Sequence, residues 1–195
     1  DLKAKILRDA LEAACDEHHK RRCGGRFLAV ELGTYCGYSA VAIGRALRDR
    51  FSRPGAPAPR DAPARLYSFE ADGKHARRAR EIVSLAGLDD WVTVRESADV
   101  RDVVGTIRRR EGRSDDEAGG PSGDAKIGFL FLDHDKDLYL SDLRAIETSG
   151  LLREGSVVVA DNVLWAYIET YVEYVRSRAK QNVLETETVE CPVEY

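Results

Sequence analysis

Side chains that could bind a cation follow two runs of strand-forming residues, at the point where each run ends. The apolar run 129–132 leads directly into Asp133, and the run 157–160 leads into Asp161 and Asn162. In open α/β sheets, ligands bind just beyond the carboxyl ends of the strands. Carboxylate and amide oxygens are the ligands that hard divalent cations prefer. The pattern therefore predicts a metal-assisted active site at these strand ends.

A lysine follows the first of these carboxylates. Lys136 could serve as a general base beside the cation. Each residue also has a simpler interpretation when it is taken alone. Asp133 and Asp161 could cap helices, while Asn162 could lie in a turn and Lys136 could be a solvated surface charge. Their joint occurrence at strand ends favours the catalytic interpretation.

The elements that must position these residues alternate between strand and helix. Apolar runs predict strands over 27–32, 66–70, 91–96, 129–132, 157–160 and 183–193. Helical periodicity predicts helices over 2–14, 40–50, 73–86, 100–107, 138–149 and 168–175. Asp72 and Asp99 are the predicted N-caps of the third and fourth helices. The alternation predicts an α/β fold with a doubly wound, mostly parallel sheet and helices on both faces.

We expect these elements to form one domain over 1–195. Stretches near 51–64 and 111–125 break the pattern, the first with prolines and the second with polar residues and glycine. Both are predicted to be surface insertions.

A glycine-containing turn follows the first predicted strand, where doubly wound folds bind their cofactor. Gly33 and Gly37 allow a tight turn and close backbone approach, and Ser39 at the start of the next helix can hydrogen-bond an anionic group. The spacing differs from G-x-G-x-x-G, so a cofactor with one carboxylate fits better than a pyrophosphate. Glu70 ends the second strand, where an acidic residue binds ribose hydroxyls. An adenosine-bearing cofactor is therefore predicted.

Composition excludes several other classes of function. The net charge of -4 gives no electrostatic argument for binding nucleic acid or a membrane surface. No apolar run approaches the ~20 residues that span a bilayer, and no signal-peptide pattern is present. The four cysteines form no C-x-x-C pair, which favours a reducing, cytoplasmic environment. The absence of methionine suggests that the sequence is incomplete, and a monomer and a dimer are equally compatible with it.

Three motifs, in this order at strand ends, closely resemble catechol O-methyltransferase. They are ELGTYCGYS at 31–39, FLDHDKD at 131–137 and ADN at 160–162. The D-x-D-K form and the segment DNVLW also resemble caffeoyl-CoA-type and bacterial cation-dependent O-methyltransferases. Cys36 and His134 favour the catechol branch.

The resemblance implies a Rossmann-like methyltransferase fold and Mg²⁺-dependent transfer of a methyl group from S-adenosylmethionine (SAM) to a catechol hydroxyl. It places the SAM site on Glu31, Gly33, Tyr35, Ser39, Glu70, Asp133 and His134. Asp133 would lie near the amino group of SAM and His134 against its adenine. The implied ligands of Mg²⁺, or of another divalent cation, are Asp133, Asp161 and Asn162. The implied substrate contacts are Lys136, Asn162 and Glu194, with Lys136 as the catalytic base.

The sequence departs from the family's pattern at several points. Asp135 stands where the family has a Trp that lines the pocket, and Ala98 and Asp99 replace a Ser and a Gln near the adenine. Segment 163–167 replaces a Pro-rich substrate lip. The family's first helices and last strand are absent, which we attribute to missing residues.

Three alternatives remain open at this stage. One is a caffeoyl-CoA-type or other cation-dependent O-methyltransferase. A dehydrogenase on the same kind of sheet is disfavoured by the missing third glycine. The third is a non-catalytic relative that binds a partner, to which Asp135 in place of the family's Trp gives some weight.

Overall fold

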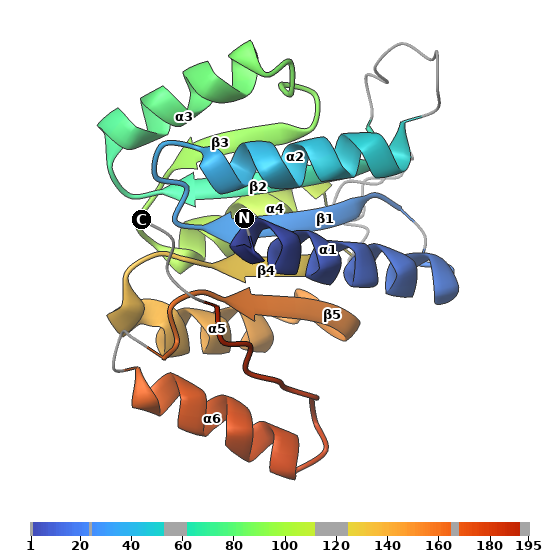
Figure 1. Ribbon diagram of the computed structural model, residues 1–195, viewed down its shortest axis with the longest axis vertical. Helices are drawn as coiled ribbons and strands as arrows, with labels where there is room; N and C mark the ends of the chain where they lie inside the picture. Colours follow the sequence, from blue (N-terminus) through green and yellow to red (C-terminus); the bar gives the residue numbers. More distant parts are fainter. Residues whose placement is uncertain (1, 24, 53–61, 112–124, 165–167, 192–195) are drawn as a thin grey trace.

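The computed structural model describes residues 2–23, 25–52, 62–111, 125–164 and 168–191. Within these ranges, a five-stranded parallel sheet has the strand order β3-β2-β1-β4-β5 (Figure 1). The strands are β1 (Phe27–Leu32), β2 (Ala64–Glu70), β3 (Val92–Glu96), β4 (Ile127–Leu132) and β5 (Leu152–Ala160). The helices are α1 (Leu2–Lys20), α2 (Tyr38–Phe51), α3 (Gly73–Leu85), α4 (Val100–Glu111), α5 (Tyr139–Thr148) and α6 (Glu169–Lys180).

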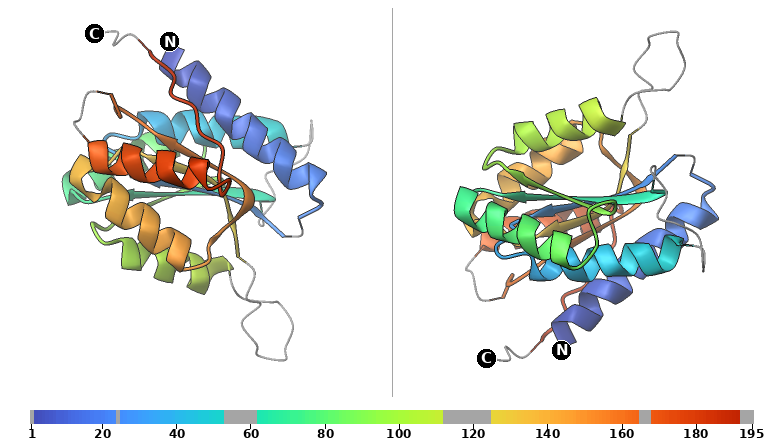
Figure 2. Two further views of the ribbon diagram at one scale, coloured as in Figure 1. Left: turned by 90° about the horizontal axis from the view of Figure 1, so that it is seen from below. Right: turned by 90° about the horizontal axis from the view of Figure 1, so that it is seen from above.

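Two apolar layers hold the sheet between helices (Figure 2). One layer packs α1, α2 and α3 on one face through residues such as Leu11, Ile43 and Val83. The other contains α4, α5 and α6, through residues such as Ile107 and Leu143. Strands β1 and β4 are buried along their whole length, as expected for parallel strands that are covered on both faces. The predicted doubly wound fold is confirmed.

Most predicted elements are present, with small differences at their ends. β1 has the predicted bounds, whereas α1 continues to Lys20 and β5 begins already at Leu152. The predicted cap Asp72 accepts hydrogen bonds from the backbone of Lys74 and His75 at 2.7 and 3.0 Å. Most of the two predicted insertions falls on 53–61 and 112–124, outside the described residues. No described helix has the length and hydrophobicity needed to cross a membrane.

The prediction of a final strand over 183–193 is wrong for its described part, 183–191. This segment forms no ladder and runs as an irregular, mostly exposed trace toward the start of α1 (Figure 2). Its alternating side chains are compatible with a strand, but a strand forms only where a partner offers hydrogen bonds. β5, which is half-buried over most of its length, is therefore an edge of the sheet within the described residues.

Gly44 provides a test of how closely α2 packs against the sheet. A Cβ added there would lie 2.4 Å from Val92 Cγ2 and 3.3 Å from Leu88 Cδ1. A Gly→Ala change in a helix ordinarily stabilises by about 1 kcal/mol, whereas overpacking a core costs about 1–3 kcal/mol. We expect overpacking to prevail, so that Gly44→Ala lowers the free energy of unfolding measured by chemical denaturation.

Gly105→Ala in α4 is the matched control for this variant. The atom nearest to its added Cβ is Nη1 of the flexible Arg109 side chain, at 3.0 Å. Because that side chain can move aside, this variant should be neutral or more stable. A gain of stability in both variants would contradict the close packing of α2 on β3.

Candidate active site

The two predicted cation-binding carboxylates lie next to each other, at the ends of adjacent strands. Leu132 of β4 pairs with Ala160 of β5, and the next residues are Asp133 and Asp161. The Asp161 N–H donates to the Leu132 carbonyl at 3.0 Å, and the Asp133 N–H donates to the Leu32 carbonyl at 2.8 Å. The backbone pairing therefore continues one residue past the strands. It fixes the start of both loops and so the positions of both carboxylates.

Each of these carboxylates contacts a lysine ammonium. Lys136 Nζ lies 2.9 Å from Asp133 Oδ1, and Lys3 Nζ lies 2.9 Å from Asp161 Oδ2. The other oxygen of Asp161 accepts a hydrogen bond from the Asn162 N–H at 2.7 Å. Asn162 has a φ of 60°, a left-handed conformation that asparagine adopts more readily than most residues. Lys3 was not predicted, because nothing at the start of a helix indicates a contact with a strand end.

Burial and neighbouring charges raise the pKa values of both Asp133 and Lys3 at this site, for different reasons. Burial raises the pKa of the Asp133 carboxyl, and Asp161 adds to this effect, while the ion pair with Lys136 opposes it. Partial burial by itself would lower the pKa of Lys3. Its hydrogen bond and charge interaction with Asp161 outweigh that effect and raise the pKa of Lys3. The site therefore combines partly desolvated acids with cationic groups at hydrogen-bond distance.

Tyr139 supports the loop that carries the predicted base. Its hydroxyl donates to the Leu132 carbonyl at 2.7 Å and accepts from Lys136 Nζ at 2.6 Å. Lys136 is thus held by two contacts, one to Asp133 and one to Tyr139. Burial and the nearby carboxylates Asp133 and Asp161 raise the pKa of Tyr139, so it remains a neutral hydroxyl. The spacing of Lys136 and Tyr139, one helical turn apart, is a signal that sequence reasoning missed.

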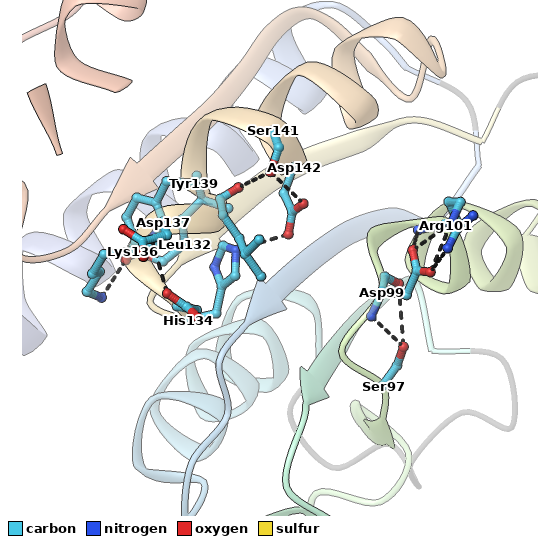
Figure 3. Close-up of polar contacts among 12 residues, drawn as sticks. Ser97, Asp99, Arg101, Leu132, His134, Lys136, Asp137, Tyr139, Ser141 and Asp142 are labelled. Atoms are coloured by element: carbon cyan, nitrogen blue, oxygen red, sulfur yellow. Dashed lines mark hydrogen bonds and ion pairs between the residues drawn. The ribbon is translucent and has the colours of Figure 1, made fainter. Parts of the chain in front are cut away.

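His134 is fixed in orientation by its neighbours (Figure 3). Its ring stacks on Tyr139, with ring centroids 4.9 Å apart, and Nε2 lies 3.1 Å from Asp142 Oδ2. Asp142 is buried in α5 and was also missed by sequence reasoning. His134 Nδ1 is buried and has no hydrogen-bond partner among the described residues. A buried ring nitrogen without a partner is costly unless a ligand atom or a water satisfies it.

The glycine turn after β1 touches the loop that carries Asp133. Gly33 has a φ of 94°, and a Cβ added there would lie 2.4 Å from the Asp133 carbonyl oxygen. A side chain at this position is therefore excluded by both conformation and space. The close approach joins the predicted cofactor turn to the predicted cation site.

Glu31 is fully buried beneath this turn. Ser68 donates a hydrogen bond to Glu31 Oε2, whereas Glu31 Oε1 has no hydrogen-bond partner among the described residues. Burial raises the pKa of Glu31 to about 7, although the hydroxyls of Ser39 and Ser68 oppose the shift. An unpaired buried carboxylate oxygen is costly, and a cationic ligand group would satisfy it.

Glu70 lies at the end of β2, as predicted, and its carboxylate is oriented by the backbone. Its Oε2 accepts from the Tyr35 N–H at 2.6 Å, and its Oε1 accepts from the Asp72 N–H at 3.0 Å. Tyr35 is 66% exposed and its ring meets the edge of His75. The turn after β1 and the end of β2 are thus tied together at the predicted ribose position.

Two departures from the family's pattern have structural roles. Asp135 caps the 3₁₀ turn Lys136–Leu138, where its Oδ1 accepts from the Asp137 N–H at 3.1 Å. Asp99 caps α4 and pairs with Arg101, on the far side of the site from His134 (Figure 3). These carboxylates therefore stabilise the starts of helical turns.

A hollow of about 2630 Å³ is lined by several of these groups. Its first part lies at the strand ends and is lined by Gly33, Glu70, Asp133 and Asp161, among others. It continues into a groove between α1, the edge of β5, α6 and segment 183–191. Glu70, Asp133, His134 and Asp161 line the hollow, so its first part is the candidate active site, whereas Glu31, Lys136 and Tyr139 do not line it.

The candidate cation ligands are two carboxylates and one amide. Among the described residues, no group of three or more His, Cys, Asp or Glu side chains is arranged to hold a metal ion. Glu194 lies outside the described residues. Cys191, which precedes it in the sequence, is close enough to Lys3 to act on the pKa of that lysine. Segment 183–191 therefore leads toward the candidate site.

Comparison with known proteins places this site in a family. Residues 30–163 match the family described as a methyltransferase domain, and the chain belongs to that family. Catechol O-methyltransferase of Bos taurus is 36% identical over 151 residues, which cover 77% of this chain and 46% of that protein. A probable O-methyltransferase of Mycobacterium tuberculosis is 41% identical over 152 residues, covering 76% of this chain and 54% of that protein. The resemblance to catechol O-methyltransferases is confirmed, and the chain spans about half the length of these two relatives.

Solved structures share the fold. The O-methyltransferase from Bacillus cereus aligns with a TM-score of 0.62 at 21% identity, covering 92% of this chain and 70% of that chain. A putative caffeoyl-CoA O-methyltransferase from Staphylococcus aureus aligns with a TM-score of 0.57 at 15% identity, covering 94% and 68%. The predicted Rossmann-like methyltransferase fold is thus confirmed.

The buried Glu31 predicts a pH-dependent stability. Its pKa rises from 4.5 to about 7 on folding, so the folded chain holds this proton more tightly than the unfolded chain. The resulting stabilisation is complete below about pH 4.5 and is lost as the pH rises through about 7. Glu31→Gln removes this dependence. We expect the variant to gain stability relative to the wild type as the pH is raised across this range.

The measurement is the difference in Tm between the variant and the wild type at several pH values. Glu81→Gln changes an exposed carboxylate of α3 that pairs with Arg78, and it serves as the control. A Glu31→Gln difference that stays constant with pH would contradict the raised pKa.

Proposed function

We propose that this chain forms the catalytic domain of a cation-dependent O-methyltransferase that transfers the methyl group of SAM to a hydroxyl of a catechol. The main observation in support of this proposal is that Asp133 and Asp161 lie at the ends of adjacent strands, with Lys136 Nζ 2.9 Å from Asp133 Oδ1. The similarity to catechol O-methyltransferase of Bos taurus supports the substrate class.

The residues around the glycine turn fit SAM. The unpaired Glu31 Oε1 and the nearby Asp133 supply negative charge for the ammonium group of SAM. Gly33 lines the hollow at the turn, where the lack of a side chain lets the turn pass against the Asp133 carbonyl, and Glu70 is positioned to bind the ribose hydroxyls. His134 would lie against the adenine. Tyr35 and Ser39 complete the proposed cofactor site.

The donor set at the strand ends fits a hard divalent cation such as Mg²⁺. Asp133, Asp161 and Asn162 would hold it through oxygen atoms. A bound cation stabilises negative charge on the attacking catechol oxygen and so favours loss of its proton. Both catechol hydroxyls are required for this function, because one reacts while the other helps to orient the ring.

In this proposal Lys136 would accept the proton of the reacting hydroxyl in its neutral form, which a divalent cation held by Asp133 would favour because the two positive charges repel each other. Its contacts with Asp133 and Tyr139 fix Nζ at the edge of the cation site. The catechol oxygen then forms a bond to the methyl carbon as the bond from that carbon to the SAM sulfur breaks, which leaves S-adenosylhomocysteine. Orientation contributes much of the rate in such an in-line displacement. Asn162 and Glu194 are the proposed further substrate contacts, with Glu194 accepting a hydrogen bond from the second hydroxyl.

Calorimetry with the full-length protein tests the proposal in order. We expect SAM to bind first, and a catechol to bind to the SAM complex with Mg²⁺ but much more weakly with a chelator. Product formation should require all three components. Binding of NAD in place of SAM would identify a dehydrogenase instead. Binding of SAM without methylation of any catechol would favour a non-catalytic relative or another acceptor.

Lys136→Ala separates catalysis from cofactor binding. Loss of a general base typically reduces the rate by about 10²–10⁴-fold, whereas the proposed SAM contacts remain in place. We therefore expect SAM affinity close to that of the wild type and turnover reduced to that extent, measured by calorimetry and by product formation.

Lys126→Ala is the matched control for this lysine. Lys126 precedes β4 at its opposite end, where Nζ donates to the Gly150 carbonyl at 2.8 Å. Replacement of Lys126 should change neither the affinity for SAM nor the turnover. Equal turnover in Lys136→Ala and the wild type would exclude Lys136 as the base.

A further inference from the structure

The start of α1 brings a second ammonium group to the proposed cation site. Lys3 Nζ lies 2.9 Å from Asp161 Oδ2, across a sequence separation of 158 residues. The side chain of Lys3 is 41% exposed and that of Asp161 is 25% exposed, so solvent screens the pair only in part. This contact belongs to a helix that carries none of the residues assigned above to catalysis or binding.

We propose that Lys3 is a counter-charge that lowers the affinity of the site for divalent cations. This inference rests on the proposed function, because it concerns the same cation site. Lys3 and an entering cation both interact with the Asp161 carboxylate, so the two positive charges compete for it. Lys3 also repels a cation bound to Asp161.

The two lysines at the site have different roles in this proposal. Lys136 comes from the same loop as Asp133 and is needed as the proton acceptor. Lys3 comes from α1, and its positive charge interacts electrostatically with the carboxylates of both Asp133 and Asp161. It therefore adds positive charge to the whole cation site without contributing to the proposed proton transfer.

The sign of the effect depends on whether Lys3 mainly orients Asp161 or mainly competes for it. Loss of an orienting contact around a metal ligand weakens metal binding. Asp161 is, however, oriented independently of Lys3. Its Oδ1 accepts from the Asn162 N–H at 2.7 Å, and its own N–H is bonded to the Leu132 carbonyl at 3.0 Å. Competition and repulsion therefore decide the sign.

The magnitude follows from Coulomb's law. A unit charge about 5 Å from a divalent cation, at a dielectric constant close to that of water, changes its affinity by about tenfold. We therefore expect Lys3→Gln, which removes the charge and keeps a side chain of similar length, to bind the cation about tenfold more tightly than the wild type.

Calorimetric titration of the full-length protein with Mn²⁺ tests this expectation. Lys3→Arg keeps the positive charge and should bind Mn²⁺ with an affinity close to that of the wild type. Lys5→Gln is the matched control: Lys5 lies on the same helix but pairs with Asp9, and both side chains are more than half exposed. Its Mn²⁺ affinity should be unchanged. Circular dichroism on each variant checks that α1 remains folded.

The outcomes distinguish this inference from the proposed function. Mn²⁺ binding by the wild type, with equal or weaker binding by Lys3→Gln, would overturn the role of Lys3 and leave the cation site intact. Tighter binding by both Lys3→Gln and Lys3→Arg would also overturn it, because charge would then not be the cause. Absence of Mn²⁺ binding by the wild type would overturn the cation site and this inference together.

Discussion

The close contact between the turn after β1 and the loop after β4 is the constraint on which the rest of the site depends. Gly33 approaches the Asp133 carbonyl so closely that no side chain could stand between them. The Asp133 N–H bonds to the Leu32 carbonyl, and its carboxylate contacts Lys136. One residue thus connects the proposed cofactor turn, the proposed cation ligands and the proposed base. Parallel register makes this possible, because it brings the carboxyl ends of β1 and β4 to the same level.

Buried negative charge is the second feature that organises the site. Glu31 and Asp133 both have a pKa raised by burial, and the charge of Asp133 adds to the upward shift at Glu31. A folded protein retains such groups where positive charge offsets their desolvation. Lys136 and Lys3 supply part of that charge at the strand ends. A sulfonium cofactor with an ammonium group and a divalent cation, as proposed, would supply more.

The irregular segment 183–191 illustrates the limit of a local pattern. Its side chains alternate as in a strand, yet it has no ladder partner within the described residues. The pattern of β1 or β4 was easier to interpret, because their nearly continuous apolar runs require cover on both faces and so imply a central position in the sheet. An exposed, acidic segment carries no such requirement.

The sequence by itself determined the alternation of strands and helices, the cap at Asp72 and the positions of Asp133, Asp161 and Lys136 at strand ends. These features depend on periodicity and on short-range chemistry, which the order of residues contains directly. Only the tertiary structure decided that Lys3 reaches Asp161, that Ser68 bonds to Glu31 and that Asp142 orients His134. Each of these contacts joins different elements or loops, and the Lys3 contact crosses nearly the whole chain. Such contacts depend on how helices and strands pack against one another, and the local pattern of residues does not indicate that packing.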